Sequence, residues 1–331
     1  MAGQLWSVSA DGGYLYGDEL SSYLRIQTQA LTKFRPLCDN FGDASEKGLH
    51  RGSLYQWDVV SDVGTQGREL AENDPMPETN STITQGSLTV TEYGNSVPYT
   101  CKLEALSQID VESLIDKSLK NDARKAFDIA AYLQFDATPL TVAPTGGTST
   151  TAVTLETTGT CTVTNNVAMG ADHVKAIVDV MMERNIPPHV DDDYVAISHQ
   201  STFRPVKNDM ESIEQYTPNG IVRIFNGEIG RYEGTRFVVQ NNIPKGGAVD
   251  STTFDPWTRT ADAWNNAKSS WAFFAGGDTV MEAIVIPEEI RAKIPGDYGR
   301  SKGIAWFYLG GFGLAHTDAT NARIVKWDSA A

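Results

Sequence analysis

Two strand-like runs on either side of a polar loop constrain this chain more than any other feature. Apolar side chains recur near every second position in residues 53–63 and again in residues 87–101, which is the pattern of half-buried strands. Two long strands alone are marginally stable in water, so the hairpin that they form must lie on another surface. The rest of its own domain or a neighbouring copy of the chain can provide that surface, and the pattern leaves both open.

A helical pattern follows the second run. Residues 109–135 predict one long amphipathic helix, because their apolar side chains recur at helical spacing along a single stripe. Basic residues occupy the remaining surface, namely Lys117, Lys120, Arg124 and Lys125. A basic helix face is usually just solvated, although it also suits enclosed DNA or an acidic partner.

The whole chain predicts one irregular α+β unit with two extended appendages, an N-terminal arm and the hairpin. The arm holds too few apolar side chains for a core of its own. Beyond the long helix, the pattern predicts a polar β-hairpin or surface insertion rich in Thr and Gly at 138–164, a helix at 171–184, a strand at 194–197, a helical stretch to about residue 210, a strand at 236–239, an excursion at 245–267 and strand-like runs over the last 60 residues.

Composition argues against several classes of protein. The 331 residues contain no apolar run of about 18 residues, so no membrane-spanning helix is predicted, and the first 17 residues lack the regions of a signal peptide. Cys38, Cys101 and Cys161 are too far apart for a disulfide framework or a metal knuckle. A formal net charge of -15 argues against a protein whose main task is to grip phosphates, because Lys and Arg supply most nucleic-acid affinity.

No catalytic or metal-binding pattern stands out, and we predict no enzymatic activity, cofactor or metal. Ser198 and His199 lack the glycines of a nucleophile elbow and predict a helix start. The three aspartates at 191–193 lack the spaced ligands of a calcium loop and indicate a solvated turn. The glycines within 310–313 lack the following helix of a phosphate loop and indicate close strand packing. The histidines are dispersed: His50, His173, His189, His199 and His316.

Two stretches resemble the major capsid proteins of tailed bacteriophages with the Hong Kong 97-type fold. The first is GEIGRYEGTRFVV at 227–239, which resembles a strand-turn-strand block of that family. The second and more specific stretch comprises PEEIRAKIP at 287–295 and DYGRSKGIAW at 297–306, followed by an apolar strand. The order of predicted elements agrees with the family over nearly the whole chain, while only these two blocks are close in residues.

The resemblance implies an α+β, Hong Kong 97-like major capsid fold in which the arm and the hairpin each lie across a neighbouring subunit. Its segments would be an N-terminal arm at 1–48, an extended β-hairpin loop at 49–106, a peripheral domain with the spine helix and a Thr-rich β insertion at 107–165, an axial domain at 166–285 and a return to the peripheral domain at 286–331.

The resemblance also implies a function. We expect a major capsid protein that assembles with itself into pentamers and hexamers of an icosahedral shell. The shell would enclose packaged double-stranded DNA without sequence-specific binding. The protein would reside in the virion capsid after assembly in the host cytoplasm. Its other partners would be a portal, a separate scaffolding protein and decoration proteins, since the chain starts directly with the arm and no fused scaffolding domain is expected.

One variation within the family can be checked against this sequence. Some members form covalent cross-links from a lysine on the extended loop to a neighbour's asparagine. Residues 52–101 contain no lysine. We therefore expect non-covalent contacts or decoration proteins to hold this shell together.

Four charged residues are candidate intersubunit contacts. Arg68 and Glu69 lie near the predicted tip of the extended loop, and Arg300 and Lys302 lie in the second resembling block. Two other structural readings stay open. One is a cellular nanocompartment shell of the same fold that encloses enzymes. The other is a phage tail or adhesin component, which the Thr-rich β segments favour and the long helix opposes.

Overall fold

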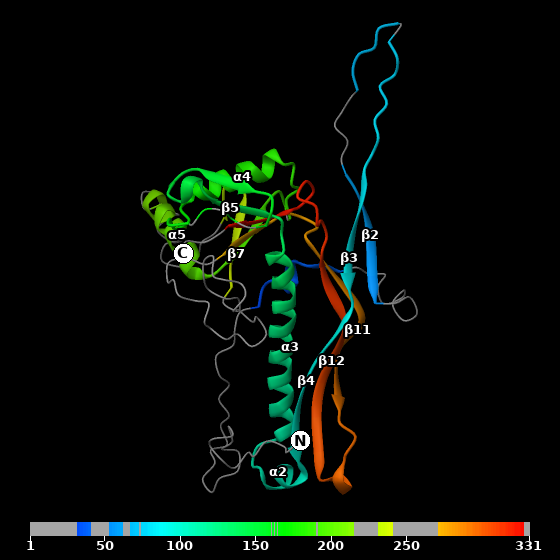
Figure 1. The fold of residues 1–331 in the computed structure, drawn as a ribbon. Coiled ribbons are helices and arrows are strands. Elements are labelled where there is room, and N and C mark those ends of the chain that lie inside the picture. The colour runs from blue at the N-terminus through cyan, green and yellow to red at the C-terminus, as the bar shows by residue number, and fades with distance from the viewer. Residues whose placement is uncertain are drawn as a thin grey trace.

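The computed structural model describes residues 32–40, 53–61, 67–72, 74–159, 161, 163, 165–189, 191–214, 231–240 and 271–327. Figure 1 shows two sheets beside one long helix, and a strand pair that continues into a far-projecting loop. No helix in the described ranges is long and apolar enough to cross a membrane. Most of the predicted arm, the excursion at 245–267 and the start of the first resembling block lie outside the described residues.

The described residues form both helices and strands, which are mixed along the chain. The helices are η2 (Arg35–Leu37), α2 (Cys101–Leu106), α3 (Val111–Asp136), η3 (Thr145–Gly147), α4 (Ala171–Glu183), α5 (Gln200–Glu214) and η5 (Asp297–Gly299). The strands are β1 (Asp39–Asn40), β2 (Leu54–Val60), β3 (Ile83–Thr89), β4 (Thr91–Thr100), β5 (Leu140–Pro144), β6 (Val153–Glu156), β7 (Tyr194–Ser198), β8 (Arg231–Tyr232), β9 (Thr235–Val239), β10 (Ala272–Ala275), β11 (Val280–Ala292), β12 (Ser301–Leu314) and β13 (Ile324–Trp327).

The long helix α3 confirms the helical pattern, and its 26 residues connect the two sheets. Asp110 caps its start by accepting hydrogen bonds from the Glu112 backbone N–H and the Ser113 hydroxyl. Its first and middle turns pack on the four-stranded sheet, ordered β1-β11-β12-β4, through residues such as Ile115 and Phe127, which are 1% exposed. Its last turns pack on the seven-stranded sheet, so one rigid helix orients both.

The seven-stranded sheet has the order β6-β5-β13-β10-β7-β9-β8 and is covered on both faces. Alternate residues of β10 divide between two cores: Phe273 faces the core shared with α3, and Phe274 faces the core shared with α4 and α5. The predicted helices at 171–184 and up to 210 and the strands at 194–197 and 236–239 are therefore confirmed.

The Thr-rich segment forms the predicted β-hairpin, but the expectation of a surface insertion was wrong. All five residues of β5 are buried, because β5 lies between β6 and β13 inside the seven-stranded sheet. That sheet also draws β13 from the last predicted segment and β7 from the predicted axial segment. The four-stranded sheet and the seven-stranded sheet thus each contain strands from more than one predicted segment. The segment bounds at 165 and 285 remain a prediction.

The second strand-like run divides into two strands, which corrects the prediction of one continuous partner strand at 87–101. β3 pairs with β2, from Leu54 opposite Thr89 to Val60 opposite Ile83. After Val90 the chain changes partners, and β4 runs antiparallel to β12 from Thr91 to Thr100. The run therefore carries the chain from the hairpin directly into the four-stranded sheet.

Candidate functional site

The base of the hairpin lies on the glycines of β12. A Cβ atom on Gly311 would be 2.5 Å from the Thr89 carbonyl oxygen, and one on Gly313 would be 2.6 Å from Leu88 Cβ. Real Cβ atoms do not approach this closely, so β3 can cross β12 only where β12 has no side chains. This confirms that close strand packing explains the glycines at 310–313.

The indole of Trp57 fastens the other strand of the hairpin. Its Nε1 donates a hydrogen bond of 2.9 Å to the Ala315 carbonyl oxygen, just beyond the end of β12. Nearby, Asn321 Nδ2 donates to Ser61 Oγ at 3.0 Å. Buried Leu88 and Ala283 complete a small apolar cluster at this crossing. The surface under the hairpin base, which the sequence left open, is therefore provided by the same chain.

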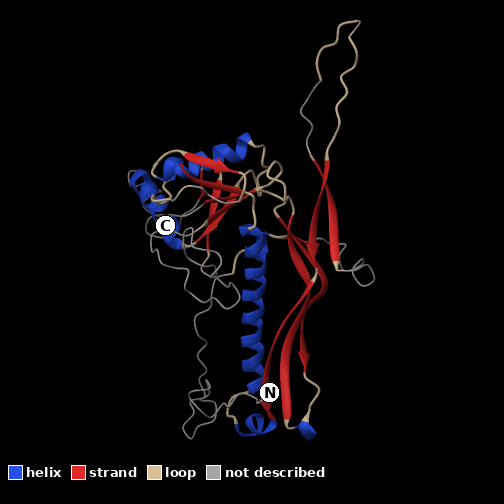
Figure 2. Cartoon of the chain, viewed as in Figure 1, coloured by secondary structure: helices blue, strands red, loops and turns tan. Residues whose placement is uncertain are grey.

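The loop between β2 and β3 has no such support. Figure 2 shows its described part, residues 67–72 and 74–82, without helix or strand over most of its length, extending beyond the rest of the protein. Its large apolar side chains are solvent-exposed: Met76 is 75% exposed, and Val60 and Ile83 at its root are 65% and 60% exposed. Large exposed apolar side chains on a projecting segment make that segment a candidate contact surface.

A second exposed apolar surface lies at the turn between β11 and β12. Ile294 is 88% exposed and Tyr298 is fully exposed, and Ile290 on β11 is 47% exposed. Figure 1 places this turn at the opposite end of the protein from the projecting loop. The two surfaces of one chain therefore cannot cover each other, and both are exposed to solvent.

Solved structures that are similar to this chain include phage capsids. The capsid of cyanophage P-SCSP1u is similar over 96% of this chain and 93% of its own, with a TM-score of 0.64 and 14% identity. The cyanophage Pam1 capsid asymmetric unit gives a TM-score of 0.64 and 16% identity over 95% of this chain and 97% of its own. The acidic stable capsid of Helicobacter pylori bacteriophage KHP30 gives 0.65 and 12% over 95% of both. This chain has the tailed-phage capsid fold.

The capsid fold is shared here without closely shared sequence. No protein-family model matches the sequence, and no curated protein matches it. Core positions accept many apolar residues of similar volume, so a fold persists when most side chains have changed. This explains why only two short blocks of the sequence resemble the family.

Within the capsid fold, the four predicted contact residues lie at opposite ends. Arg68 and Glu69 are exposed on the projecting loop. Arg300 forms a weak, exposed pair with Asp297 at 3.6 Å, and Lys302 Nζ lies 2.7 Å from Glu104 Oε2 of the same chain. The hydrogen bond to Glu104 raises the pKa of Lys302. One chain does not bring the four together, and their role between subunits stays a prediction.

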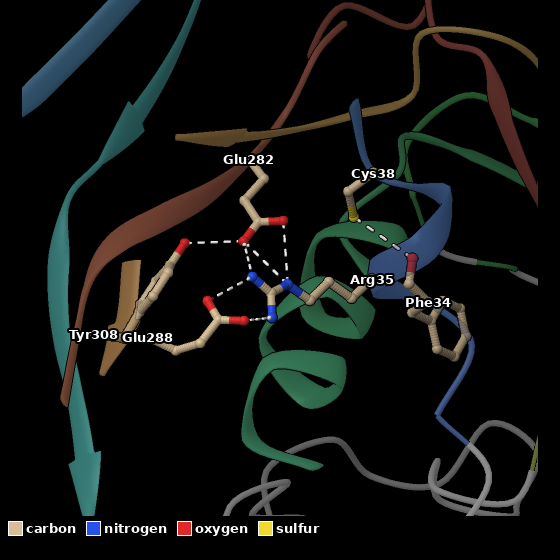
Figure 3. A network of polar contacts seen from close by, with 6 residues as sticks. All are labelled: Phe34, Arg35, Cys38, Glu282, Glu288 and Tyr308. Atoms are coloured by element: carbon tan, nitrogen blue, oxygen red, sulfur yellow. Dashed lines mark hydrogen bonds and ion pairs between the residues drawn. The ribbon is translucent and has the colours of Figure 1, made fainter. Parts of the chain in front are cut away.

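An arginine clamp that the sequence did not reveal holds the segment 32–40 against the capsid fold. Figure 3 shows Arg35 between two carboxylates, Glu282 of β11 and Glu288 further along it. Its Nη2 donates to Glu282 Oε1 at 2.9 Å, its Nη1 donates to Glu288 Oε1 at 3.2 Å, and the guanidinium lies 4.4 Å from the centre of the Phe127 ring. Tyr308 Oη also donates to Glu282, at 2.9 Å.

The pKa values of several side chains in and beside the clamp are shifted. Burial disfavours the charged form of Arg35, but hydrogen bonds to both carboxylates outweigh burial and raise its pKa. Burial and the neighbouring Glu282 charge raise the pKa of the Tyr308 hydroxyl, so it stays a proton donor. Burial likewise raises the pKa of the Cys38 thiol, which keeps it protonated and unreactive.

A buried carboxylate on α3 anchors the same segment. Asp128 is fully buried and accepts a 2.8 Å hydrogen bond from the Phe34 backbone N–H, while Gln240 Nε2 donates to its other oxygen. The Phe34 ring packs edge-on against Tyr132 and Phe273. Phe34 is therefore part of the core, and it holds the segment 32–40 against α3 and the seven-stranded sheet.

Acid should weaken the clamp. Burial raises the pKa of Glu288, but the Arg35 hydrogen bonds and charge lower it by more, so its net pKa is below the usual value. A depressed pKa stabilises the fold above the unfolded-state value of about 4.3, and that stability is lost as the pH falls further. We expect urea denaturation to show the free energy of unfolding falling from pH 5 to pH 3, less steeply in Glu288→Gln. Equal slopes in both proteins would contradict this.

The remaining motifs have structural roles. Ser198 Oγ donates to the Trp271 carbonyl oxygen at 2.6 Å, and α5 begins at Gln200, which confirms a helix start. The aspartate turn is only partly solvated: Asp191 is exposed, whereas Asp193 is fully buried with Arg236 Nε at 2.7 Å. Within the described ranges, no group of three or more His, Cys, Asp or Glu side chains could hold a metal ion.

Proposed function

We propose that this chain is a major capsid protein that assembles with copies of itself into pentamers and hexamers of an icosahedral shell enclosing packaged double-stranded DNA. One observation carries the proposal. The capsid fold extends over about 95% of this chain, and its projecting loop carries apolar side chains that its own chain leaves exposed. Covering those side chains requires other molecules, and further copies of the chain fit this requirement.

The proposed role is structural rather than catalytic. The protein would reside in the virion capsid, assemble in the host cytoplasm and work with portal, scaffolding and decoration proteins. Its segments would act as predicted, with the arm at 1–48 and the loop within 49–106 crossing neighbours, and with a peripheral domain and an axial domain at 166–285 forming the capsomer.

The shell would depend on many non-covalent contacts. Residues 52–101 contain no lysine, so a lysine cross-link from the extended loop is not expected. A standard interface buries roughly 1,600 Å² in total, and each subunit would repeat such contacts with several neighbours. Modest pair energies then sum to a stable closed assembly, while single misplaced subunits can still leave.

Arg68→Ala and Glu69→Ala should each lower the yield of shells and their resistance to heat. Both side chains are exposed on the projecting loop, where pairing with a neighbour is available, and an exposed pair contributes about 0 to 1 kcal/mol. The effect per subunit is therefore small but is repeated around the shell. Shell yield after gradient centrifugation and light scattering during heating measure it. Unchanged yield and heat resistance in both variants would remove these residues as contacts.

Assembly itself can be tested with a loop-shortened variant. The full chain, expressed alone or with a candidate scaffold, should give closed shells or capsomers on size exclusion and negative-stain electron microscopy. Replacing residues 67–82 with a short Gly-Ser linker should prevent shells but leave thermal unfolding nearly unchanged, because β2 and β3 keep their contacts with β12. A stable monomer from the full chain under every salt and scaffold condition would overturn the proposed function.

A further inference from the structure

One face of α3 carries only positive charge. Lys117, Lys120 and Arg124 are exposed, and at 3.6 residues per turn they point within about 60° of one another. Arg124 also lines a hollow together with Arg35 and Glu282. Lys117 and Arg124 are separated by about 10 Å along the helix axis. We refer to these three residues as the basic stripe.

The acidic residues of the same stretch of helix have partners, and only Asp116 pairs with a residue of the stripe. Glu112 accepts a hydrogen bond of 2.8 Å from Tyr99, and Asp122 accepts one of 3.0 Å from Trp306 Nε1. Asp116 pairs with Lys120 at 2.7 Å. Lys117 and Arg124 form no ion pair with any residue that the structure describes. The stripe is therefore incompletely neutralised in a chain whose net charge is -15.

We propose that the basic stripe binds the phosphate backbone of the enclosed duplex, so that this face of α3 lines the shell's interior. The inference rests on the proposed function. Duplex DNA presents one charge per roughly 1.7 Å of its axis, so a straight row of cations meets phosphates in any register. Long Lys and Arg side chains contact phosphates without reading base edges. Three cations per chain give weak, reversible contacts that suit a genome that must be packed and released.

The test compares two variants with equal changes of charge. The stripe variant is Lys117→Gln/Lys120→Gln/Arg124→Gln, and the control is Lys175→Gln/Lys293→Gln/Arg204→Gln, whose residues are exposed on α4, after β11 and on α5. Each loses three positive charges, so general repulsion of DNA changes equally. Gln has nearly the helix propensity of Lys and Arg, and matching thermal melts will show that both variants fold.

Unassembled full chain, isolated by size exclusion, is titrated into a fluorescently labelled 30-base-pair duplex. Three phosphate contacts predict wild-type affinity about 40-fold weaker at 200 mM than at 50 mM salt. The control should keep this salt dependence, and the stripe variant should lose it together with most of the binding at 50 mM.

Two outcomes would overturn the inference. In one, the stripe variant binds the duplex as tightly as the control, or the wild type shows no salt-dependent binding. In the other, poly-glutamate binds the wild type more tightly than the duplex does, which would assign the stripe to an acidic polypeptide. Electron microscopy of the same proteins distinguishes failure of the inference from failure of the proposed function. Shells formed by a protein that does not bind the duplex would refute only the inference. Failure of the wild type to form shells would refute the proposed function.

Discussion

Replacing Gly311 with valine should unseat the hairpin from the four-stranded sheet and lower the free energy of unfolding by about 3 kcal/mol. A Cβ atom at this position would lie 2.5 Å from the Thr89 carbonyl oxygen and 3.1 Å from a Leu88 methyl carbon. The nearest atom belongs to the backbone of β3, so the clash cannot be relieved by a side-chain rotation. The strand must move away, and the Trp57 hydrogen bond to Ala315 is lost with it.

Gly296→Ala is the matched control. Gly296 lies in the turn before β12, has an extended backbone, and a Cβ atom there would meet nothing within 4 Å. Urea denaturation should therefore separate the two variants clearly, with Gly296→Ala close to wild type. Shells should be absent with Gly311→Val, because the displaced hairpin carries the projecting loop with it. Equal stability of the two variants would show that β3 does not rely on this crossing.

Local sequence patterns predicted helices and strands well where one face of the element is buried and the other is exposed. The apolar stripe of α3 is continuous and the helix lies where the stripe predicted it. The spacing at 171–184 likewise located α4. Such patterns report only which face is buried. They cannot report the partner, which is why the continuous run at 87–101 concealed a change of partner at Val90.

Burial on both faces misled the sequence-based interpretation of β5. The threonines and glycines of residues 138–164 suggested a polar β-hairpin or surface insertion, yet Thr141 of β5 is only 2% exposed. The strand is buried because β6 and β13 flank it and cores cover the sheet. β3 gave a different error: it begins at Ile83, so its first residues had been assigned to the polar loop between the two strand-like runs. In both cases tertiary position overrode local composition.

The candidate assembly surfaces were only partly predictable. The absence of lysine and the length of the loop could be seen directly, but Met76, Ile294 and Tyr298 are single apolar residues in polar stretches and show no periodicity. The second resembling block contains Ile294 and Tyr298 and was the one signal that indicated them. The clamp gave no signal at all, because Arg35 and Glu282 are 247 positions apart.

Removing the clamp arginine should have an effect similar in size to that of the glycine substitution. Arg35→Ala leaves the Glu282 carboxylate, 7% exposed, without its cation, and breaking a buried pair from one side costs about 3 kcal/mol or more. It also removes a cation from the Phe127 ring. We expect the melting temperature and the urea midpoint to fall together. Arg300→Ala, which removes an arginine from an exposed pair, is the control and should change neither appreciably.

A second substitution separates the cost of the unpaired charge from the loss of packing. Glu282→Gln removes the charge but keeps a side chain of the same shape, which can still accept the hydrogen bond from Tyr308. In the Arg35→Ala background it should restore stability, because no buried charge is then left without a partner. In the wild-type background it should lower stability, because Arg35 loses its nearer carboxylate. If Glu282→Gln has the same effect in both backgrounds, the two residues are not coupled, and the clamp stabilises the segment 32–40 through packing alone.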